Sequence, residues 1–172
     1  NWASQPEVLK MIGKHYKTGE TIHDKLIEKM KAANLHNQGF SLTEFIAAGL
    51  LDMHWHMHKT KDIPDIKPFE IKVREKIGLI PEIEFRYRSP YFSHIFDAGY
   101  AVGYYGYAWA EILDADAFQA FKENGLFDQK TAKTFRKYIL SAGGSDDAMK
   151  NYVKFRGKEP TIDALLERRG LK

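Results

Sequence analysis

The side chains best suited to chemistry in this chain are a run of phenols and one histidine near its middle. Tyr100, Tyr104, Tyr107 and Glu111 follow one another at steps of four, three and four residues, and His94 stands ahead of them. In an α-helix this spacing places the hydroxyl and carboxyl groups along one stripe. Glycines interrupt the run and reduce its bulk. We therefore predict a polar helix face that an extended peptide can approach closely.

A simpler interpretation of the same run is that its rings belong to a core. Val102, Tyr105 and Trp109 lie on the opposite side of the predicted helix, where we expect them to pack inward. Buried tyrosines commonly satisfy their hydroxyl groups within the fold. Helical spacing alone therefore does not separate a binding face from a structural one, and the argument for function depends on a longer motif.

The longer motif covers residues 94–109 and reads His-Ile-Phe-x-x-Gly-Tyr-Ala-x-Gly-Tyr-Tyr-x-Tyr-x-Trp, after Arg-Tyr-Arg-Ser at 86–89. It resembles the C-terminal catalytic-domain signature of the thimet oligopeptidase family of zinc metallopeptidases. The lead-in is most similar to the bacterial peptidyl-dipeptidase branch. The resemblance extends over nearly the whole chain, with further matching segments at 139–145, 155–160 and 164–170.

The resemblance implies a peptidase that hydrolyses short peptides with a zinc-activated water. It assigns catalytic contacts to His94 and Tyr107, with Tyr107 as hydrogen-bond donor to the oxyanion, and a substrate contact to Tyr100. Tyr104, which shares the predicted stripe, is a further substrate-binding candidate, although its ring is expected mainly to pack. A phenol suits the donor role because its pKa near 10 keeps it protonated at neutral pH. A neutral donor aimed at developing negative charge stabilises the transition state. The implied partner is a peptide substrate.

The predicted substrate-binding loop, about residues 86–100, departs from the family at one point. The family pattern Gly-Gly-Gly-Tyr is replaced by Asp97-Ala98-Gly99-Tyr100. Side chains at two of the glycine positions should stiffen the loop, and Asp97 adds a carboxylate beside it. No proposed contact residue is lost.

Two arginines at the start of this loop could recognise a peptide C-terminus. An enzyme that removes dipeptides from the C-terminal end must bind a free carboxylate, and a guanidinium does so with two parallel hydrogen bonds. Arg86 and Arg88 are both predicted substrate-binding residues, and Arg88 is favoured because it stands nearer His94. The alternative is a structural ion pair with a neighbouring acidic residue, Glu82, Glu84 or Asp97.

No zinc site can be assembled from this sequence in an obvious way. None of the seven histidines is followed by glutamate, whereas the peptidase motif is His-Glu-x-x-His. His54 and His58 have helical chelating spacing but lack a third ligand. We therefore expect no metal ligand in this chain, and the resemblance places the zinc-binding helix in a missing N-terminal portion of a parent enzyme. The isolated chain is predicted to be inactive.

Composition narrows the class of protein further. The 172 residues are 44% hydrophobic and 28% charged, which is ordinary for a globular domain. The 26 basic and 23 acidic residues are interspersed, so no nucleic-acid partner is predicted. Cysteine is absent, and no apolar run reaches the roughly 18 residues of a membrane helix. We expect no membrane partner and a cytoplasmic location.

Helical periodicity and capping residues dominate the chain, so the predicted fold class is all-α. We expect about seven or eight helices in a bundle that forms a single C-terminal lobe, residues 1–172, of a larger zincin-type domain. Expected helix starts include Pro6, a Thr21–Asp24 capping box, a Ser41–Glu44 capping box and Pro68. Residues 59–67 are the predicted flexible connection. The alternative function for such a chain is a non-catalytic helical protein-interaction module.

Overall fold

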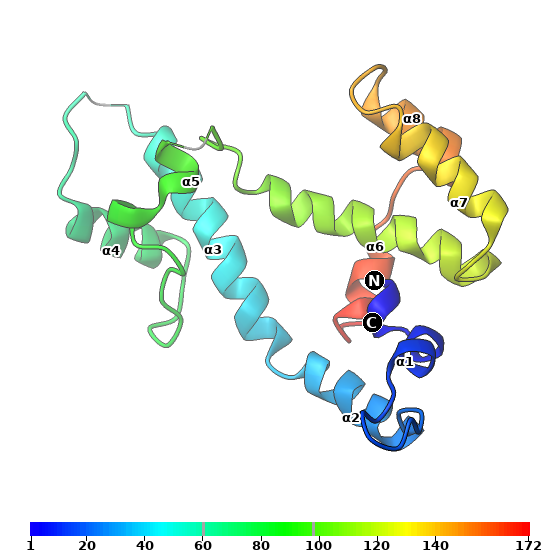
Figure 1. Cartoon of the computed structure of the whole chain (residues 1–172). Helices are drawn as coiled ribbons and strands as arrows, with labels where there is room; N and C mark the ends of the chain where they lie inside the picture. Colours follow the sequence, from blue (N-terminus) through cyan, green and yellow to red (C-terminus); the bar gives the residue numbers. More distant parts are fainter. Residues whose placement is uncertain (60, 98) are drawn as a thin grey trace. The chain divides into compact units, whose positions relative to one another are not determined.

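The computed structural model describes residues 1–59, 61–97 and 99–172, and within these ranges the secondary structure is helical (Figure 1). The helices are α1 (Pro6–Ile12), α2 (Asp24–Leu35), α3 (Gln38–His56), α4 (Ile66–Lys76), α5 (Ser93–Phe96), α6 (Gly106–Asn124), α7 (Gln129–Phe135), α8 (Ala148–Arg156) and α9 (Asp163–Arg168), with 3₁₀ turns η1 (Trp2–Ser4) and η2 (Ser89–Tyr91) and a π-helical segment η3 (Arg136–Leu140). The all-α prediction is confirmed over the described ranges, where seven α-helices have at least seven residues. None of the described helices has the length and apolar content of a membrane span.

Two helices near the N-terminus begin elsewhere than the capping patterns predict. Thr21 pairs with Lys14 in an isolated antiparallel bridge, so α2 begins only at Asp24. The next helix, α3, begins three residues before Ser41, directly after Asn37 in the left-handed conformation with φ 55°. In both places the local backbone, a β-bridge at Thr21 and a left-handed Asn37, sets the start of the helix in place of the predicted capping box.

Helix ends in the C-terminal part follow side-chain capping. Asp128 caps α7 by accepting the Thr131 N–H at 2.7 Å. Asp147 caps α8 by accepting the Lys150 N–H at 2.8 Å. The helix then ends at Gly157, whose φ of 78° glycine adopts without steric cost.

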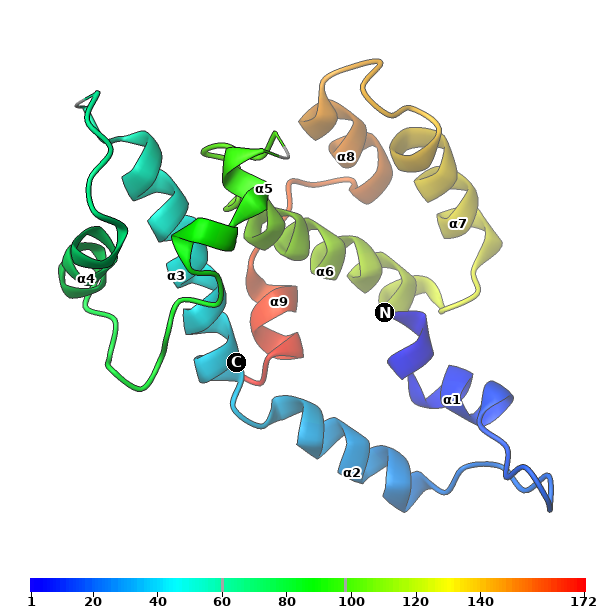
Figure 2. The same cartoon turned by 60° about the vertical axis from the view of Figure 1, so that its left-hand side comes forward.

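The chain divides into two compact units. Unit 1 comprises Asn1–His36 and Glu111–Lys172, and unit 2 comprises Asn37–Ala110. In unit 1, α7 and α8 are neighbours through η3, as Figure 2 also shows. Trp2 packs edge-on against Phe118 and Phe121 with ring centroids 4.7 Å apart, which ties the start of the chain to α6. The single-lobe organisation stays a prediction.

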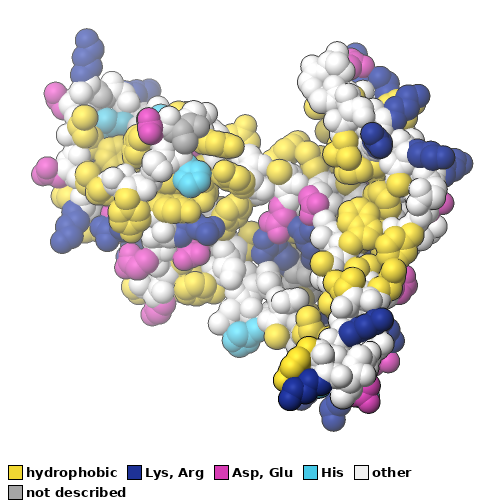
Figure 3. Space-filling model, in the orientation of Figure 1, with side chains coloured by type: hydrophobic (Ala, Val, Ile, Leu, Met, Phe, Trp, Pro, Cys, Tyr) yellow, Lys and Arg dark blue, Asp and Glu magenta, His cyan; other side chains and the backbone are white. Residues whose placement is uncertain are grey.

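Unit 2 holds every described residue of the predicted site and has its own core. Its two long helices, α3 and α4, pack together, and residues from 77–97 and 99–105 pack over them. The buried core comprises Ala47, Ala48, Leu51, Val73, Leu79, Ile83, Phe85, Phe92, Ile95 and Tyr104. Figure 3 shows hydrophobic side chains gathered around a histidine on the drawn face of this unit. α3 and α4 are therefore the supports on which the irregular segment rests.

Candidate functional site

A buried carboxylate on α4 fixes the beginning of the loop that leads to His94. Glu70, only 3% exposed, accepts hydrogen bonds from the Ser89 N–H at 2.7 Å and the Ser89 hydroxyl at 2.8 Å. Its second oxygen accepts from Arg88 Nε at 2.6 Å. Trp55 Nε1 donates to the same Ser89 hydroxyl at 2.8 Å. The Arg88–Ser89 segment is thus held by a charge that is itself fully paired, as a buried charge must be.

The short helix α5 then presents His94 beside this anchor. Phe92 and Ile95 are almost completely buried and fix the helix to the core of unit 2. His94 lies between them in sequence and is half-buried, so its imidazole sits at the boundary between core and solvent. The histidine is therefore positioned by its two apolar neighbours.

A second buried carboxylate, on α3, holds the turns that carry the tyrosines. Asp52 is fully buried, and its two oxygens accept the N–H groups of Val102 and Tyr104, each at 3.0 Å. His56 Nδ1 lies 2.9 Å from the same carboxylate. Between the two amides, Val102 has a φ of 58°, a left-handed conformation that is unusual for a β-branched residue.

The predicted stripe of four groups on one helix is wrong in part. The helix α6 begins only at Gly106, so Tyr100 and Tyr104 precede it and only Tyr107 and Glu111 are helical. The reason is that amides which would start an earlier helix donate to Asp52, 50 and 52 residues away, while turns occupy 101–105. Within unit 1, Glu111 accepts from Arg168 and Arg169 instead.

The turns nevertheless bring the predicted residues together in what we call the phenol cluster, made of His94, Tyr100, Tyr104 and Tyr107. Tyr100 and Tyr107 stack with ring centroids 5.6 Å apart and an interplanar angle of 16°. The His94 ring lies 6.3 Å from Tyr100, 5.9 Å from Tyr104 and 6.5 Å from Tyr107. A folded loop thus achieves the convergence that was expected from a helix.

The tyrosines of the phenol cluster differ in exposure: Tyr104 is buried, whereas Tyr100 and Tyr107 form an exposed pair. Tyr104 is 4% exposed and packs in the core, with its ring 5.2 Å from that of Tyr107. Tyr100 and Tyr107 are 44% and 40% exposed. The hydroxyl groups accessible to a ligand in this cluster therefore belong to Tyr100 and Tyr107, beside the half-exposed His94.

Local electrostatics favour the protonated form of two phenols in the cluster, those of Tyr107 and Tyr104. A hydrogen bond with the Tyr100 side chain raises the pKa of Tyr107 above that of an ordinary tyrosine. Burial, the larger effect at Tyr104, raises its pKa as well, although the nearby Arg86 opposes it. Both shifts favour the neutral form, so near pH 7 the hydroxyl groups are donors rather than anions.

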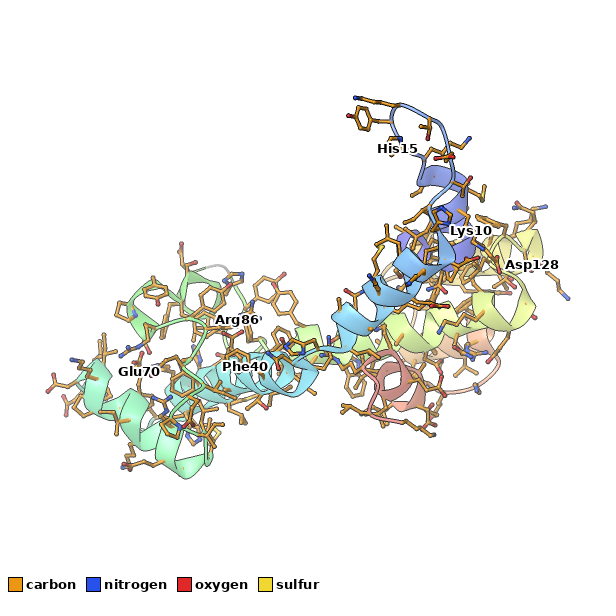
Figure 4. All side chains as sticks on the ribbon, turned by 90° about the horizontal axis from the view of Figure 1, so that it is seen from below. Lys10, His15, Phe40, Glu70, Arg86 and Asp128 are labelled. Atoms are coloured by element: carbon orange, nitrogen blue, oxygen red, sulfur yellow. The ribbon has the colours of Figure 1, made fainter. Side chains whose placement is uncertain are left out.

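The two arginines lie in different surroundings. Arg86 is exposed, with its guanidinium 5.4 Å from the Phe45 ring and 5.6 Å from the Tyr87 ring, and the Tyr87 ring is 5.5 Å from that of His94. Arg88 instead pairs with Glu70, which raises the pKa of Arg88. Figure 4 labels Glu70 on α4 and Arg86 on the loop. Arg86 is therefore the arginine beside the phenol cluster, and Arg88 belongs to the loop anchor.

The side chains expected on the core side of the stripe do not pack as predicted. Val102, Tyr105 and Trp109 are all large and exposed, whereas Tyr104 is the buried ring. For Val102 and Tyr105 the change follows from the turn, which takes residues 101–105 out of helical register. Trp109 lies within α6 and is exposed there. The predicted stiffening of the loop by Ala98 falls on a residue outside the described ranges.

A zinc site in this chain would have to be built from His, Asp and Glu side chains, because the sequence has no cysteine. In those ranges no group of three or more His, Asp or Glu side chains could hold a metal ion. Of the histidine pair with chelating spacing, His54 lies within α3, where burial lowers its pKa, and His58 lies beyond the end of the helix with its Nε2 3.3 Å from the Asp62 carbonyl oxygen. The described part of the chain does not fit a zinc site.

Sequence reasoning missed both anchoring carboxylates. Asp52 follows a stretch of small and apolar residues in α3, and that isolated charge on a helix face was the available signal for a buried acid. Glu70 stands among the alternating charges of α4, and nothing local distinguishes it from its exposed neighbours. Tyr87 and Phe45, which flank Arg86, were also not predicted.

Comparison with known proteins relates the chain to peptidases along its length. The sequence model of Peptidase family M3 matches residues 1–171. Dipeptidyl carboxypeptidase from Escherichia coli strain K12 is 41% identical over 174 residues, covering 99% of this chain and 25% of the relative. Oligopeptidase A from the same strain is 38% identical over 174 residues, covering 100% of this chain and 25% of the relative. The organellar oligopeptidase A of Arabidopsis thaliana is 41% identical, covering 99% of this chain and 22% of the relative. The chain thus spans about a quarter of the length of these relatives.

The anchor at Glu70 can be tested by Glu70→Gln. In the parent chain both carboxylate oxygens of Glu70 accept hydrogen bonds from Arg88 and Ser89. The glutamine amide has one acceptor oxygen, and its NH₂ group faces one of these donors, which loses its partner. We expect a loss of about 1.5–3 kcal/mol in the free energy of unfolding, measured by urea denaturation of the chain. Glu75→Gln, an exposed position on the same helix, is the matched control. Equal stability of the two variants would contradict the anchoring role.

Proposed function

The chain belongs to peptidase family M3, and on that premise we propose that it forms the peptide-binding part of a zinc-dependent oligopeptidase or peptidyl-dipeptidase that hydrolyses short peptides. The observation that carries the proposal is the convergence of His94, Tyr100 and Tyr107 at an exposed surface of unit 2. Family membership implies zinc in the intact enzyme, which lowers the barrier to attack of water on a peptide carbonyl. The described residues form no group of side chains that could hold such an ion, so the roles proposed below are those of the chain's own side chains.

Tyr107 is the proposed donor to the oxyanion. It stands in the first turn of α6, a rigid element, and its phenol is neutral and stacked on Tyr100. A donor that is already oriented gains more at the transition state than in the ground state, because the hydrogen bond strengthens as charge develops on oxygen. Tyr107 therefore contributes to the rate of the chemical step.

Tyr100 and His94 are proposed to position the peptide. Tyr100 follows Gly99, whose φ of 77° allows the tight turn, and its N–H donates to the His94 carbonyl at 3.1 Å. The ring of Tyr100 thus depends on α5 for its place. His94 can donate to the substrate carbonyl or orient its backbone from the other side of the cluster. Tyr104 is predicted from sequence to contact substrate, but we propose that its buried ring packs against His94 and Tyr107 and holds them in place.

Arg86 is the proposed ligand for a substrate C-terminal carboxylate. Within the described ranges no carboxylate pairs with it, and its guanidinium rests on aromatic rings that hold it beside the cluster. Arg88, the arginine favoured by sequence, has its Nε committed to Glu70. A guanidinium without an internal anionic partner needs no ion pair broken before it binds a ligand carboxylate.

The proposal predicts a drop in turnover for Tyr107→Phe in the zinc-loaded enzyme. The ring and most packing remain, so folding and zinc content should stay near normal. Removal of one oxyanion donor typically lowers kcat by about 10²–10³. KM should change little, because the lost hydrogen bond acts mainly in the transition state.

Tyr105→Phe is the control for that substitution, since Tyr105 is an adjacent exposed tyrosine outside the phenol cluster. Its turnover should match the parent enzyme. The proposal is wrong if Tyr107→Phe turns over at the parental rate with zinc bound, or if Tyr105→Phe loses as much.

Recognition of the substrate C-terminus predicts a selective effect of Arg86→Gln. The glutamine keeps part of the stem but removes the charge, so kcat/KM should fall by about 10- to 100-fold on free-acid peptides and little on C-terminally amidated ones. Arg88→Gln is the comparison and should affect both peptides alike. A selective loss in Arg88→Gln rather than Arg86→Gln would return the role to Arg88.

One sequence observation separates this proposal from a non-catalytic interaction module. The peptidase proposal predicts that the reading frame encoding the chain also encodes His-Glu-x-x-His ahead of residue 1, followed within about 30 residues by a glutamate. Its product should contain one zinc per chain after dialysis. A complete reading frame without that motif would favour the interaction module.

A further inference from the structure

Asp52 lies on α3 and does not contact the hydroxyl group of Tyr100 or of Tyr107. It binds the turn at residues 101–105, which joins these two tyrosines. We infer that Asp52 is a positioning residue for peptide hydrolysis, setting the relative orientation of Tyr100 and Tyr107 by holding the intervening turn in a conformation it would not adopt alone. The inference rests on the proposed function, because it concerns how the tyrosine donors are aimed.

The geometry of the turn is that of an anion-binding nest. The N–H groups of Val102 and Tyr104 both point at the Asp52 carboxylate, one to each oxygen, at 3.0 Å. Such a pair of amides forms a concave site for an anion when one of the residues is left-handed, and Val102 has a φ of 58°. Here a buried side chain of the same protein takes the place of the anion. The carboxylate therefore determines the backbone angles between residues 102 and 104.

The position of that nest explains why it bears on catalysis. The Gly103 N–H donates to the Tyr100 carbonyl at 2.7 Å, and the Gly106 N–H donates to the Gly103 carbonyl at 3.0 Å. A continuous chain of hydrogen bonds thus connects Tyr100, through the nest, to the first residue of α6 and so to Tyr107. Rotation of the turn would separate the two stacked rings, which now lie 5.6 Å apart.

The conformation held by Asp52 is one that valine disfavours. A Cβ-branched residue at positive φ is a backbone outlier and persists only where its surroundings impose it. The Asp52 carboxylate, which imposes this conformation, is fully buried and lies 2.9 Å from His56 Nδ1. Its own position is therefore fixed by several neighbours. The backbone conformation imposed on Val102 therefore fixes the relative positions of Tyr100 and Tyr107.

The test is a double-mutant cycle between Asp52 and Tyr107 in the zinc-loaded enzyme. Asp52→Asn keeps the shape but replaces one acceptor by an NH₂ group that faces a backbone donor. Small misplacements of catalytic groups cost up to about 10²-fold, so we expect a 10- to 100-fold loss of kcat, and KM should rise as well because Tyr100, which positions the peptide, is displaced with Tyr107. In the Tyr107→Phe background the same substitution should lower kcat by less than about threefold, because the oxyanion donor that it positions is already absent.

A rescue substitution distinguishes positioning from general stability. Val102→Gly removes the side chain that resists positive φ, so it should restore a large part of the turnover of Asp52→Asn. Ala101→Gly, at an exposed neighbouring position without positive φ, is the matched control and should restore none. Equal behaviour of the two glycine variants would overturn the inference.

A measurement on the zinc-free chain is independent of activity. The hydrogen bond with Tyr100 raises the pKa of Tyr107 above that of an ordinary tyrosine. In Asp52→Asn the phenol should titrate closer to free tyrosine, as followed by NMR of the labelled ring carbons. An unchanged titration of Tyr107 would contradict the proposed link between the turn and the ring pair.

The outcomes separate this inference from the function on which it rests. A Tyr107→Phe enzyme with parental turnover overturns the proposed function and this inference with it. A Tyr107→Phe loss combined with an Asp52→Asn loss that is equal in both backgrounds overturns the inference alone. Should Asp52→Asn not fold, Asp52→Glu replaces it, because it retains the charge while displacing the carboxylate by one methylene, and the same coupling is expected.

Discussion

Backbone amides of an irregular segment bind two buried carboxylates, and the candidate site of this protein depends on that pairing. Glu70 on α4 takes the Ser89 amide, and Asp52 on α3 takes the amides of Val102 and Tyr104. A buried charge is tolerated only when it is paired, and a loop is ordered only when its amides have acceptors. The carboxylates supply the acceptors and the amides supply the donors, so the segment that carries α5 and His94 is held at both ends by side chains of α3 and α4.

The irregular backbone at residues 101–105 gives the three tyrosines different surroundings, which a regular helix with the same spacing would not. A regular helix keeps residues 100, 104 and 107 on one stripe but gives all three rings similar surroundings. The turn instead buries the Tyr104 ring in the core and leaves Tyr100 and Tyr107 stacked at the surface. Neutral phenols on a fixed backbone are preorganised donors, and this is the arrangement that stabilisation of a developing oxyanion requires.

Sequence predicted the helical class and the identity of the cluster because both depend on local signals and on one long motif. It did not predict that α6 begins at Gly106, since the competing acceptor for the upstream amides, Asp52, lies about 50 residues away in sequence. For the same reason the local sequence indicates only nearby acids as partners for Arg88, whereas its partner in the structure is Glu70, 18 residues earlier. Local pattern identifies residue types, whereas pairings between distant polar groups decide which side chain faces a ligand.

The most direct test of the account compares a tetrahedral analogue with a plain peptide. Transition-state mimics gain from a preorganised donor, whereas ground-state ligands do not. The affinities of a phosphinic peptide and of the unmodified product peptide should therefore be measured for the parent enzyme and for Tyr107→Phe. The account predicts that the variant loses affinity for the phosphinic peptide by about the factor lost in kcat/KM and keeps its affinity for the product peptide. Equal losses for both ligands, or no loss for either, would contradict it.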